Sequence, residues 1–583
     1  MELLLALVLA VVTIALATAL APRVGILAPL VLVVVGVMVS LLPFVPDVLI
    51  DPEWILMGIL PPLLYSAAVS LPAMEFRRDF AAISSLSVAL VIVTAFALGV
   101  FFAWVIPGLG IALAIALGAI LSPTDAVATS IVRRLGISPR TVTVLEGESL
   151  LNDATALVLL SSATGAATGA FGLAESVLDF VWAVVAAVGI GLIVGLVNLR
   201  VRAWVANTAA ATALSFVVPF VAYLPTEHLG GSGLVAAVVA GIVTGQGAPR
   251  WFTPAQRISD HVNWRTIELI LEGAVFLLMG LELATVLSDS ARDHGGLGHA
   301  AWLAAAAVAI VLVLRTGWVA PLVWLQSRRT RAHPAGRNRL RALEKRIDAA
   351  ESRMPGASDT AAAAGGADGN PAADRPTPRP WHRARRRVRR ALADIDYFES
   401  SPLGWRHGTI IVWAGMRGAV TLAAAQTLPR DTPSRSLIVL VAFLVAAGTL
   451  LLQGGTLAWL TRALRLGEER TGTSRTELEA LNVELHAAAA AAVADPALTR
   501  ADGRAFDDAT RRRVAERWSR PRDGDLTARA HETLELRLVA IRAMRARLVA
   551  VRGEGAYATA TLRRALGELD AEELSLQQRL GGS

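Results

Sequence analysis

Long apolar runs alternate with short polar connections along most of this chain. Thirteen of the runs approach or reach the length of about 20 residues that a helix needs to cross the hydrocarbon core of a bilayer. In order they cover residues 3–20, 24–42, 54–72, 81–105, 110–131, 142–165, 181–199, 208–225, 232–247, 265–287, 301–326, 407–428 and 436–461. The pattern predicts an all-α polytopic membrane protein with about 13 transmembrane helices.

Composition agrees with that class and excludes several others. The 583 residues are 54% hydrophobic with a mean hydropathy of +0.54, which is far more apolar than a soluble protein. Cysteine is absent, so disulfides and thiolate metal sites are excluded. The net charge of +7 comes from many arginines, typical of genome base composition, so we expect no nucleic-acid partner. Walker and dinucleotide motifs are missing, and we predict neither an enzyme nor a bound cofactor.

The distribution of charge between the runs predicts an orientation. Acidic residues predominate in the connections after even-numbered runs, while arginines gather in those after odd-numbered runs. The arginines concerned are Arg23, Arg77, Arg78, Arg133, Arg134, Arg140, Arg200, Arg202, Arg250 and Arg257. Cytoplasmic connections carry the excess of basic residues. We therefore expect a plasma-membrane protein with its N-terminus outside and its C-terminus in the cytoplasm.

Two segments outside the apolar runs divide the chain into four parts. We predict helices 1–11 in 1–327, a partly disordered basic insert in 328–405, helices 12 and 13 in 406–463, and a cytoplasmic helical tail in 464–583. The insert contains a Gly, Ala, Pro and Asp stretch that has too little apolar surface to order. Its basic run, 381–390, is typical of segments that bind anionic lipid headgroups, and a solvated charged helix explains it equally well.

Four polar side chains share one stripe of the sixth run. Helical spacing stacks Glu148 on Asn152 and Ser149 on Asp153, one turn apart in neighbouring columns. A charged acid at the centre of a membrane helix costs roughly 2.5–3.5 kcal/mol, so such residues default to ion pathways, proton relays or buried pairs. A polar seam that joins helices is the structural alternative, although a seam does not require an acid.

A proline interrupts the fifth run beside another acid. Pro123 lacks a backbone donor and crowds the preceding turn, so we expect the helix to break there, next to Thr124 and Asp125. Unwound backbone at membrane depth is tolerated where it lines a cavity, and secondary transporters bind ions at such breaks. A kinked helix without a functional role is the alternative.

Two arginines lie inside the eleventh and twelfth runs. Arg315 is too deep to reach water easily, and Glu148 is its best partner, which would leave Asp153 as the acid free to titrate. Arg417 lies in a glycine-flanked stretch that we also expect to unwind. Structural bracing alone is an alternative for both. The tenth run holds two acids with a weaker signal, Glu272 and Glu282.

Four segments together resemble the monovalent cation/proton antiporter family, which includes bacterial and animal sodium/proton exchangers. They are 122–128 (Ser-Pro-Thr-Asp-Ala-Val-Ala), 147–153 (Gly-Glu-Ser-Leu-Leu-Asn-Asp), 415–420 (Gly-Met-Arg-Gly-Ala-Val) and Ser232 to Gly245. The similarity spans about residues 1–465. It implies a thirteen-helix fold with inverted repeats, broken helices that cross at the fifth and twelfth spans, a homodimer, and elevator-like alternating access.

The same resemblance assigns roles to individual residues. It makes Asp153 the acid that binds the ion and the proton, with Asn152 as its partner. It implies a structural ion pair, Glu148 with Arg315, and a supporting residue, Arg417. It places an alkali cation at Asp153 and Asp125. Its further ligands, or residues that support those ligands, would be Thr124, Asp125 and Ser149.

The chain departs from the family pattern at two positions. Ala126 stands where relatives often have proline, which affects how the fifth span unwinds. Ser66 stands where many relatives have an acid, which affects the hydrogen bonding of Asn152.

Competition at one carboxylate gives the functional hypothesis. Desolvation disfavours the charged form of Asp153, so a proton and a small hard cation become alternative occupants of the same oxygens. Because Asn152 cannot titrate where electrogenic relatives carry a second acid, the resemblance implies electroneutral exchange of one cation per proton. A cation channel and a proton-coupled transporter of organic anions are the alternatives. The second would use Arg315 and Arg417 to bind its substrate.

Overall fold

The computed structural model consists of two compact units, Met1–Arg470 and Thr471–Ser583. In the first unit it describes residues 2–24, 28–42, 54–125, 127–167, 173–292, 296–331, 401–428 and 432–466. Shorter stretches are described within 341–346, 388–399 and 487–577. Most of the basic run 381–390 and of the Gly, Ala, Pro and Asp stretch of the insert lies outside the described residues, so the predictions made for them remain predictions.

Each predicted apolar run coincides with helix. The first unit contains α1 (Glu2–Val24), α2 (Ala28–Ser40), η1 (Trp54–Ile59), α3 (Leu60–Ser70), α4 (Ala73–Ser84), η2 (Ser85–Ala89), α5 (Leu90–Val105), α6 (Ile111–Leu121), α7 (Val127–Arg134), α8 (Pro139–Ala167), α9 (Leu173–Trp204), α10 (Thr208–His228), α11 (Gly233–Trp251), α12 (Pro254–Arg292), α13 (Gly296–Arg331), α16 (Trp405–Trp413), α17 (Ala419–Gln426), α18 (Arg435–Thr449), η3 (Leu450–Gly454) and α19 (Gly455–Ala463). The predicted all-α membrane fold is confirmed.

Not every helix is long and apolar enough to cross a membrane by itself. Among the described residues, seven segments are long and apolar enough: Leu4–Ala21, Met74–Val105, Pro139–Ala167, Val181–Trp204, Thr208–His228, Leu297–Arg328 and Arg435–Ala463. Shorter apolar helices cover Ala28–Ser40, Trp54–Ser70 and Ile111–Leu121. The number of 13 crossings therefore stays a prediction.

Several arginines that we expected in connections lie inside helices. Arg77 and Arg78 belong to α4, and Arg140 lies in the first turn of α8, where it is only 1% exposed. These three residues still lie outside the predicted runs 54–72, 81–105 and 142–165, because the helices extend beyond the apolar runs. Arg140 tolerates burial because it forms an ion pair with Asp79, which is also buried.

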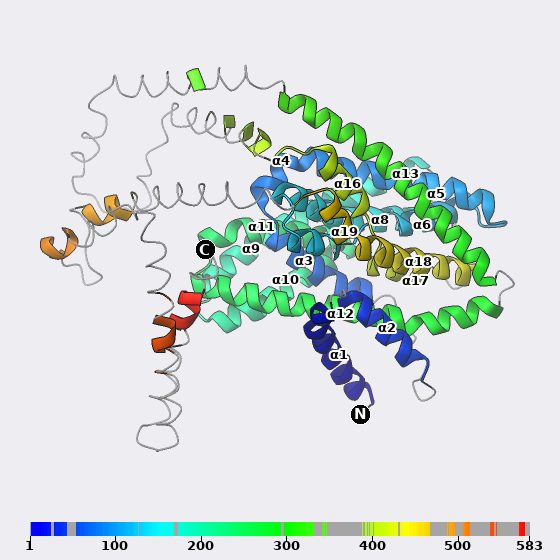
Figure 1. The fold of residues 1–583 in the computed structure, drawn as a ribbon, viewed down its shortest axis with the longest axis horizontal. Helices are drawn as coiled ribbons and strands as arrows, with labels where there is room; N and C mark the ends of the chain where they lie inside the picture. The colour runs from blue at the N-terminus through cyan, green and yellow to red at the C-terminus, as the bar shows by residue number, and fades with distance from the viewer. Residues whose placement is uncertain are drawn as a thin grey trace. The chain divides into compact units, whose positions relative to one another are not determined.

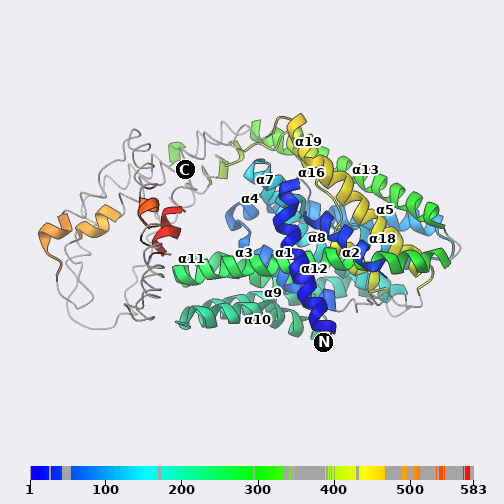
Figure 2. The same ribbon diagram turned by 60° about the horizontal axis from the view of Figure 1, so that its bottom comes forward.

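The helices pack as two groups. In one, α11 contacts α9, α3 and α10, and α12 contacts α1 and α2. In the other, α6 contacts α5 and α8, while α13 contacts α16 and α18. Figures 1 and 2 show these neighbours side by side from two directions. Small residues permit the close contacts within each group, as at Gly118 on Ala95 and Gly191 on Ala236.

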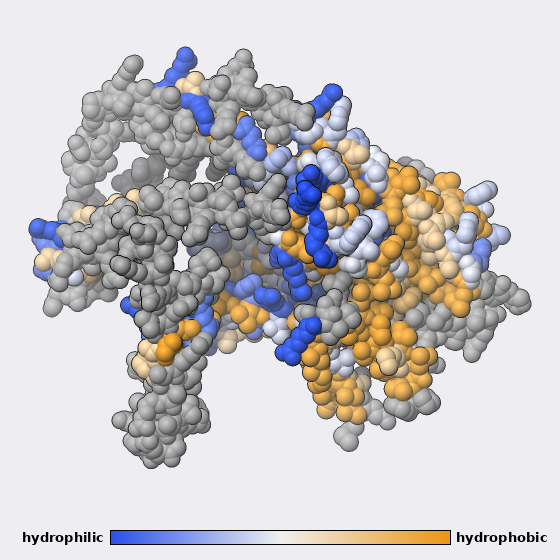
Figure 3. All heavy atoms as spheres, viewed as in Figure 1, coloured by the Kyte–Doolittle hydropathy of each residue, from blue (hydrophilic) through white to orange (hydrophobic). Residues whose placement is uncertain are grey.

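The outer surface of the first unit is hydrophobic. Figure 3 shows hydrophobic residues covering much of the visible face over α1, α2 and the α13–α18 region. Large apolar side chains point outward, such as Trp104, which is 84% exposed. A surface of this kind fits a lipid environment.

The second unit has short helical stretches in its described residues, at 489–494, 508–512, 537–541 and 571–577. We predicted helical periodicity in Thr533 to Val551 and in Tyr557 to Leu580. Most of both stretches lies outside the described residues.

Candidate functional site

Two helices break in the middle of the first unit, and the breaks contact each other. The α6 helix ends at Leu121 and α7 begins at Val127, so the interruption lies at Pro123 as expected. The α16 helix ends at Trp413 and α17 begins at Ala419. The backbone N–H of Asp125 in the first break donates to the carbonyl oxygen of Met416 in the second, at 2.8 Å. The predicted crossing of broken helices is thus present.

A glycine makes this crossing possible. A β-carbon on Gly418 would collide with the carboxylate of Asp125, so only a hydrogen fits there. A side chain on Gly415 would likewise meet the guanidinium of Arg315. Close steric contacts therefore explain both glycines that flank Arg417, at positions 415 and 418.

Arg417 stabilises the end of the first half-helix. Its Nε donates to the carbonyl oxygen of Leu121 at 2.9 Å and its Nη2 to that of Ser122 at 3.2 Å, while Nη1 contacts the carbonyl of Gly415. The last carbonyls of a helix have no partner within it and carry partial negative charge. A cation at that position satisfies both needs, although Arg417 is only 3% exposed.

Glu148 and Arg315 form a buried ion pair. Arg315 Nη1 contacts Glu148 Oε1 and Nη2 donates to Oε2 at 2.8 Å, with 3% and 1% of the two side chains exposed. The guanidinium also donates to the carbonyl oxygen of Ile411, through Nε at 3.0 Å and Nη2 at 2.9 Å. The bidentate geometry is the strong form of an arginine–carboxylate contact.

A short polar chain leads from this pair into the first break. The Asn152 Nδ2 donates to the Thr124 hydroxyl at 2.6 Å, and that hydroxyl lies 3.5 Å from Glu148 Oε1. The structure thus places the Asn152 amide on Thr124 and not on Asp153. Within the described residues Asn152 Oδ1 has no hydrogen-bond partner.

Asp153 lines a cavity of about 110 Å³. Its side chain is 9% exposed, and no arginine or lysine forms an ion pair with it in the part of the chain that the structure describes. Asp125 lines the same cavity and its Oδ1 accepts from the backbone N–H of Val127 at 3.2 Å, which caps α7. The polar lining residues are Thr124, Asp125, Ser149, Asp153, Glu268, Glu272 and Thr421.

The other predicted residues line a separate space of about 10 Å³. It is bordered by Glu148, Asn152, Arg315 and Arg417 together with Ser122 and residues of α5, η2 and α13. The structure therefore divides the predicted residues into two sets, one around a cavity and one around a tightly packed ion pair.

Three cavity residues had little or no sequence signal. Glu272 was one of two acids singled out in the tenth run, while Glu268 of the same run and Thr421 were not singled out. Glu268 and Glu272 are four residues apart on one helix, and this spacing was the available signal that they share a face. Thr421 follows the second break and carried no such pattern.

A second buried ion pair fixes the start of α8. Arg140 Nη2 donates to Asp79 Oδ1 at 2.7 Å, and the hydroxyl of Tyr397 donates to Asp79 Oδ2 at 2.9 Å. Burial, with the Asp79 carboxylate as the next cause, raises the pKa of Tyr397 above its ordinary value. The end of the predicted insert therefore packs on α4 and α8.

No group of three His, Cys, Asp or Glu residues that could hold a metal ion occurs among the described residues. The site instead offers the carboxylates of Asp125 and Asp153, with the hydroxyl groups of Thr124 and Ser149, beside a cavity. Hard cations prefer such oxygen ligands.

Comparison with known proteins gives consistent matches. The family model described as "Sodium/hydrogen exchanger, transmembrane" matches residues 9–343 and 388–463. An uncharacterized Na(+)/H(+) exchanger of Mycobacterium tuberculosis is 30% identical over 474 residues, which cover 78% of this chain and 75% of that protein. A sodium, potassium, lithium and rubidium/H(+) antiporter of Bacillus subtilis is 31% identical over 46% of this chain and 41% of its own length.

A solved structure shares the fold. The sodium proton antiporter MjNhaP1 of Methanocaldococcus jannaschii aligns with a TM-score of 0.55 at 16% identity, covering 80% of this chain and 100% of that one. The matches confirm the predicted family, and with it a membrane transporter and not an enzyme. The chain belongs to the sodium/hydrogen exchanger family of monovalent cation/proton antiporters.

Proposed function

We propose that the protein exchanges sodium, or another alkali cation, for a proton at Asp153 by electroneutral alternating access. One observation carries the proposal: Asp153 is nearly buried, borders the 110 Å³ cavity, and has no cationic partner among the described residues. Glu148, five positions earlier on the same helix, is neutralised by Arg315. This difference supports Asp153 as the acid that changes occupant.

The exchange follows from competition for the same two oxygens. A partly desolvated carboxylate is more stable with a proton or a metal cation bound than with neither. The loaded site is close to neutral and can move between the two sides, while the empty site meets a dielectric barrier. Both ions therefore use one site in turn, and neither crosses alone.

Thr124, Asp125 and Ser149 are the other ligands or supports that we propose. All three border the cavity with Asp153. Asn152 acts on this set through Thr124, to which its amide is hydrogen-bonded. Because Asn152 does not titrate and Glu148 is paired, we propose one cation exchanged per proton.

The transport of organic anions would need free cationic ligands. Arg315 is engaged by Glu148 and by the Ile411 carbonyl, and Arg417 by the carbonyls of Leu121 and Ser122. Neither guanidinium is among the residues that line the larger cavity. The geometry therefore favours a cation as the transported ion.

The proposal includes a homodimer in the plasma membrane, with the N-terminus outside and the regions 328–405 and 464–583 in the cytoplasm. The charge asymmetry of the connections supports this orientation. A protease-protection assay on the tail in sealed vesicles tests it.

Asp153→Asn tests the central assignment. In proteoliposomes this variant should lose sodium-driven proton flux while it keeps its thermal unfolding profile. Ser162→Ala is a matched control, since it lies on the same helix and its hydroxyl bonds only the Val158 carbonyl of its own helix. Wild-type flux in Asp153→Asn would place the ion site elsewhere.

A further inference from the structure

One buried hydroxyl on the cavity wall lacks a protein partner. Thr421 lines the cavity of about 110 Å³ together with Asp125 and Asp153, and its side chain is only 1% exposed. Among the residues that the structure describes, no group forms a hydrogen bond with Thr421 Oγ1. A buried polar atom without a partner bears a desolvation cost that water or an ion must compensate. This hydroxyl therefore marks a place where something in the cavity completes the structure.

Other buried threonines of this protein satisfy their hydroxyls within their own helix. Thr155, Thr226 and Thr461 each donate to the carbonyl oxygen four residues earlier, at 2.9, 2.7 and 2.8 Å. This bond is the ordinary one for a threonine in a helix interior. Thr421 differs from these three residues although it is also helical and buried.

The second helix break removes that bond from Thr421. The α17 helix begins at Ala419, so the residue four positions before Thr421 is Arg417, which lies in the break. The carbonyl oxygen of Gly418, three positions before, accepts from the backbone N–H of Thr421 at 3.2 Å. The interruption of the helix thus leaves the Thr421 hydroxyl to an occupant of the cavity.

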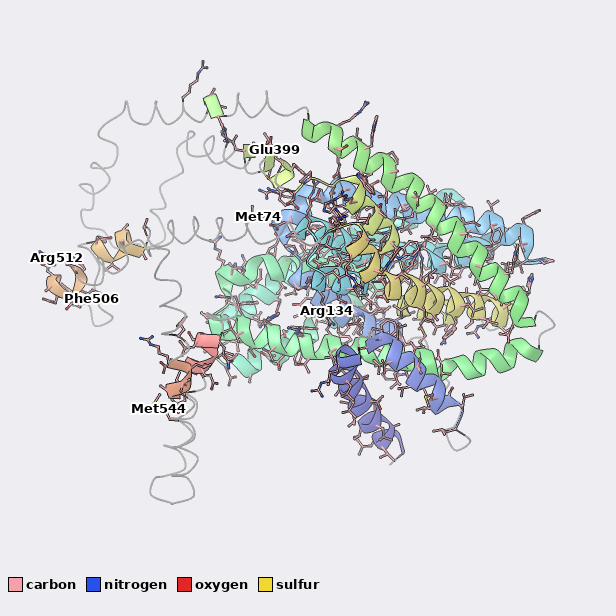
Figure 4. All side chains as sticks on the ribbon, viewed as in Figure 1. Met74, Arg134, Glu399, Phe506, Arg512 and Met544 are labelled. Atoms are coloured by element: carbon pink, nitrogen blue, oxygen red, sulfur yellow. The ribbon has the colours of Figure 1, made fainter. Side chains whose placement is uncertain are left out.

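The electrostatics at the start of α17 are compatible with a cation. The first break leads into α7, which ends at Arg134 (Figure 4), and Asp125 caps the start of α7 by accepting from the backbone N–H of Val127. The Asp125 carboxylate also lies against Gly418, the residue before α17. The N-terminus of a helix carries partial positive charge. One acid therefore offsets the positive ends of both half-helices, so neither end repels a cation in the cavity.

The oxygen ligands that the cavity offers come from several sides. Besides the two acids of α12, Thr124 and Asp125 belong to the first break, Ser149 and Asp153 to α8, and Thr421 to α17. The α3 side is apolar and consists of Leu60, Leu63, Leu64 and Ala67. A cation that gives up water there must replace it with oxygen atoms of the polar side, where the Thr421 hydroxyl is the group that α17 supplies.

We propose that Thr421 Oγ1 is a direct ligand of the transported alkali cation, contributed by the second broken helix. The inference rests on the proposed function and adds a ligand to the site around Asp153. A hydroxyl has two acceptor lone pairs and one donor, so its oxygen can bind a cation while its hydrogen donates to a carboxylate. Hard cations prefer such oxygen ligands. Because the hydroxyl does not titrate, its loss weakens cation binding and leaves proton binding at Asp153 nearly unchanged.

Exchange kinetics in proteoliposomes test this role. Thr421→Val keeps the shape of the side chain without its oxygen, and should raise the sodium concentration for half-maximal exchange about tenfold, the size expected for one lost contact to a charged group. The proton concentration for half-maximal exchange, measured with saturating sodium on the other side of the membrane, should change less than about twofold, since valine removes no titratable group. Thr421→Ser keeps the hydroxyl and should show the wild-type sodium dependence.

Thr461→Val is the matched control. It removes the same oxygen from an equally buried threonine, whose hydroxyl donates to the Leu457 carbonyl of its own helix at 2.8 Å. Its sodium dependence should equal that of the wild type. Thr421→Ala removes the oxygen at the proposed site in a second way, and replaces the valine variant if that variant does not fold.

Four results would overturn the proposal. They are an unchanged half-saturating sodium concentration in Thr421→Val or Thr421→Ala, an equal rise in Thr461→Val, a rise of the same size in Thr421→Ser, and a parallel rise for sodium and protons, which would indicate a packing defect. If Asp153→Asn is inactive in the same assay, any of these results leaves the exchange site at Asp153 standing without Thr421. Wild-type flux in Asp153→Asn would instead remove the proposed function itself.

Discussion

Glu148 and Asp153 lie five residues apart on α8 and are almost equally hidden, with 1% and 9% exposed, yet their surroundings differ completely. Glu148 meets Arg315 in a space of about 10 Å³, where there is hardly room for one water. Asp153 borders a cavity of about 110 Å³ and has no basic partner among the described residues.

The comparison shows that burial alone does not make a transport acid. Both carboxylates bear a desolvation cost, and the two surroundings compensate it in different ways. A fixed guanidinium neutralises Glu148 permanently, so that acid braces α8 against α13. In our proposal, Asp153 is instead neutralised by a mobile cation or proton that reaches it through the cavity.

The largest effect on stability is expected at the paired acid. Glu148→Gln leaves the Arg315 guanidinium buried without its counter-charge, and breaking one partner of a buried pair costs about 3–5 kcal/mol. Thermal unfolding in detergent measures this loss. The double variant Glu148→Gln with Arg315→Gln should recover much of the stability, and a double variant as unstable as the single one would contradict the pairing argument.

The next effect is expected where the two breaks cross. Gly418→Ala forces a methyl group into the Asp125 carboxylate and should cost about 1–3 kcal/mol, with loss of exchange. Gly448→Ala is the control, since nothing lies within 4 Å of the added carbon. Equal exchange rates in the two variants would show that the crossing is looser than described.

Arg417→Lys tests the cap on α6. Lysine keeps the charge but cannot reach the Leu121 and Ser122 carbonyls with a planar fork, so we expect a loss of about 1–2 kcal/mol in stability. Unfolding measurements should show this loss, whereas Arg406→Lys at the exposed Trp405 should have no effect. A wild-type unfolding profile for Arg417→Lys would exclude the capping role.

The smallest effect is expected from Thr124→Val. The variant removes the acceptor of the Asn152 amide and should cost about 1 kcal/mol, while shifting the sodium dependence of exchange because Thr124 borders the cavity. Thr155→Val, whose hydroxyl bonds only its own helix, is the control. The same sodium dependence in both variants would remove Thr124 from the ion site.

Most of the helices and much of the site could be predicted from the sequence, and the reasons can be identified. Periodic apolar runs and Pro123 predict the helices and the first break. The spacing of Glu148 and Asp153 predicts that both face protein. Helix ends were less predictable, because Arg140 is buried by a partner 61 residues away in sequence. Glu268 on α12 and Thr421 on α17 were missed, since only the tertiary packing of these two helices brings the residues to the cavity.

Simultaneous measurement of cation binding and proton release on the purified protein tests the central claim most directly. Addition of sodium to unbuffered protein in detergent should release up to one proton per cation bound, and Asp153→Asn should bind weakly and release none. Proton release that persists in Asp153→Asn, or sodium binding to the wild type without any release at every pH, would contradict the account.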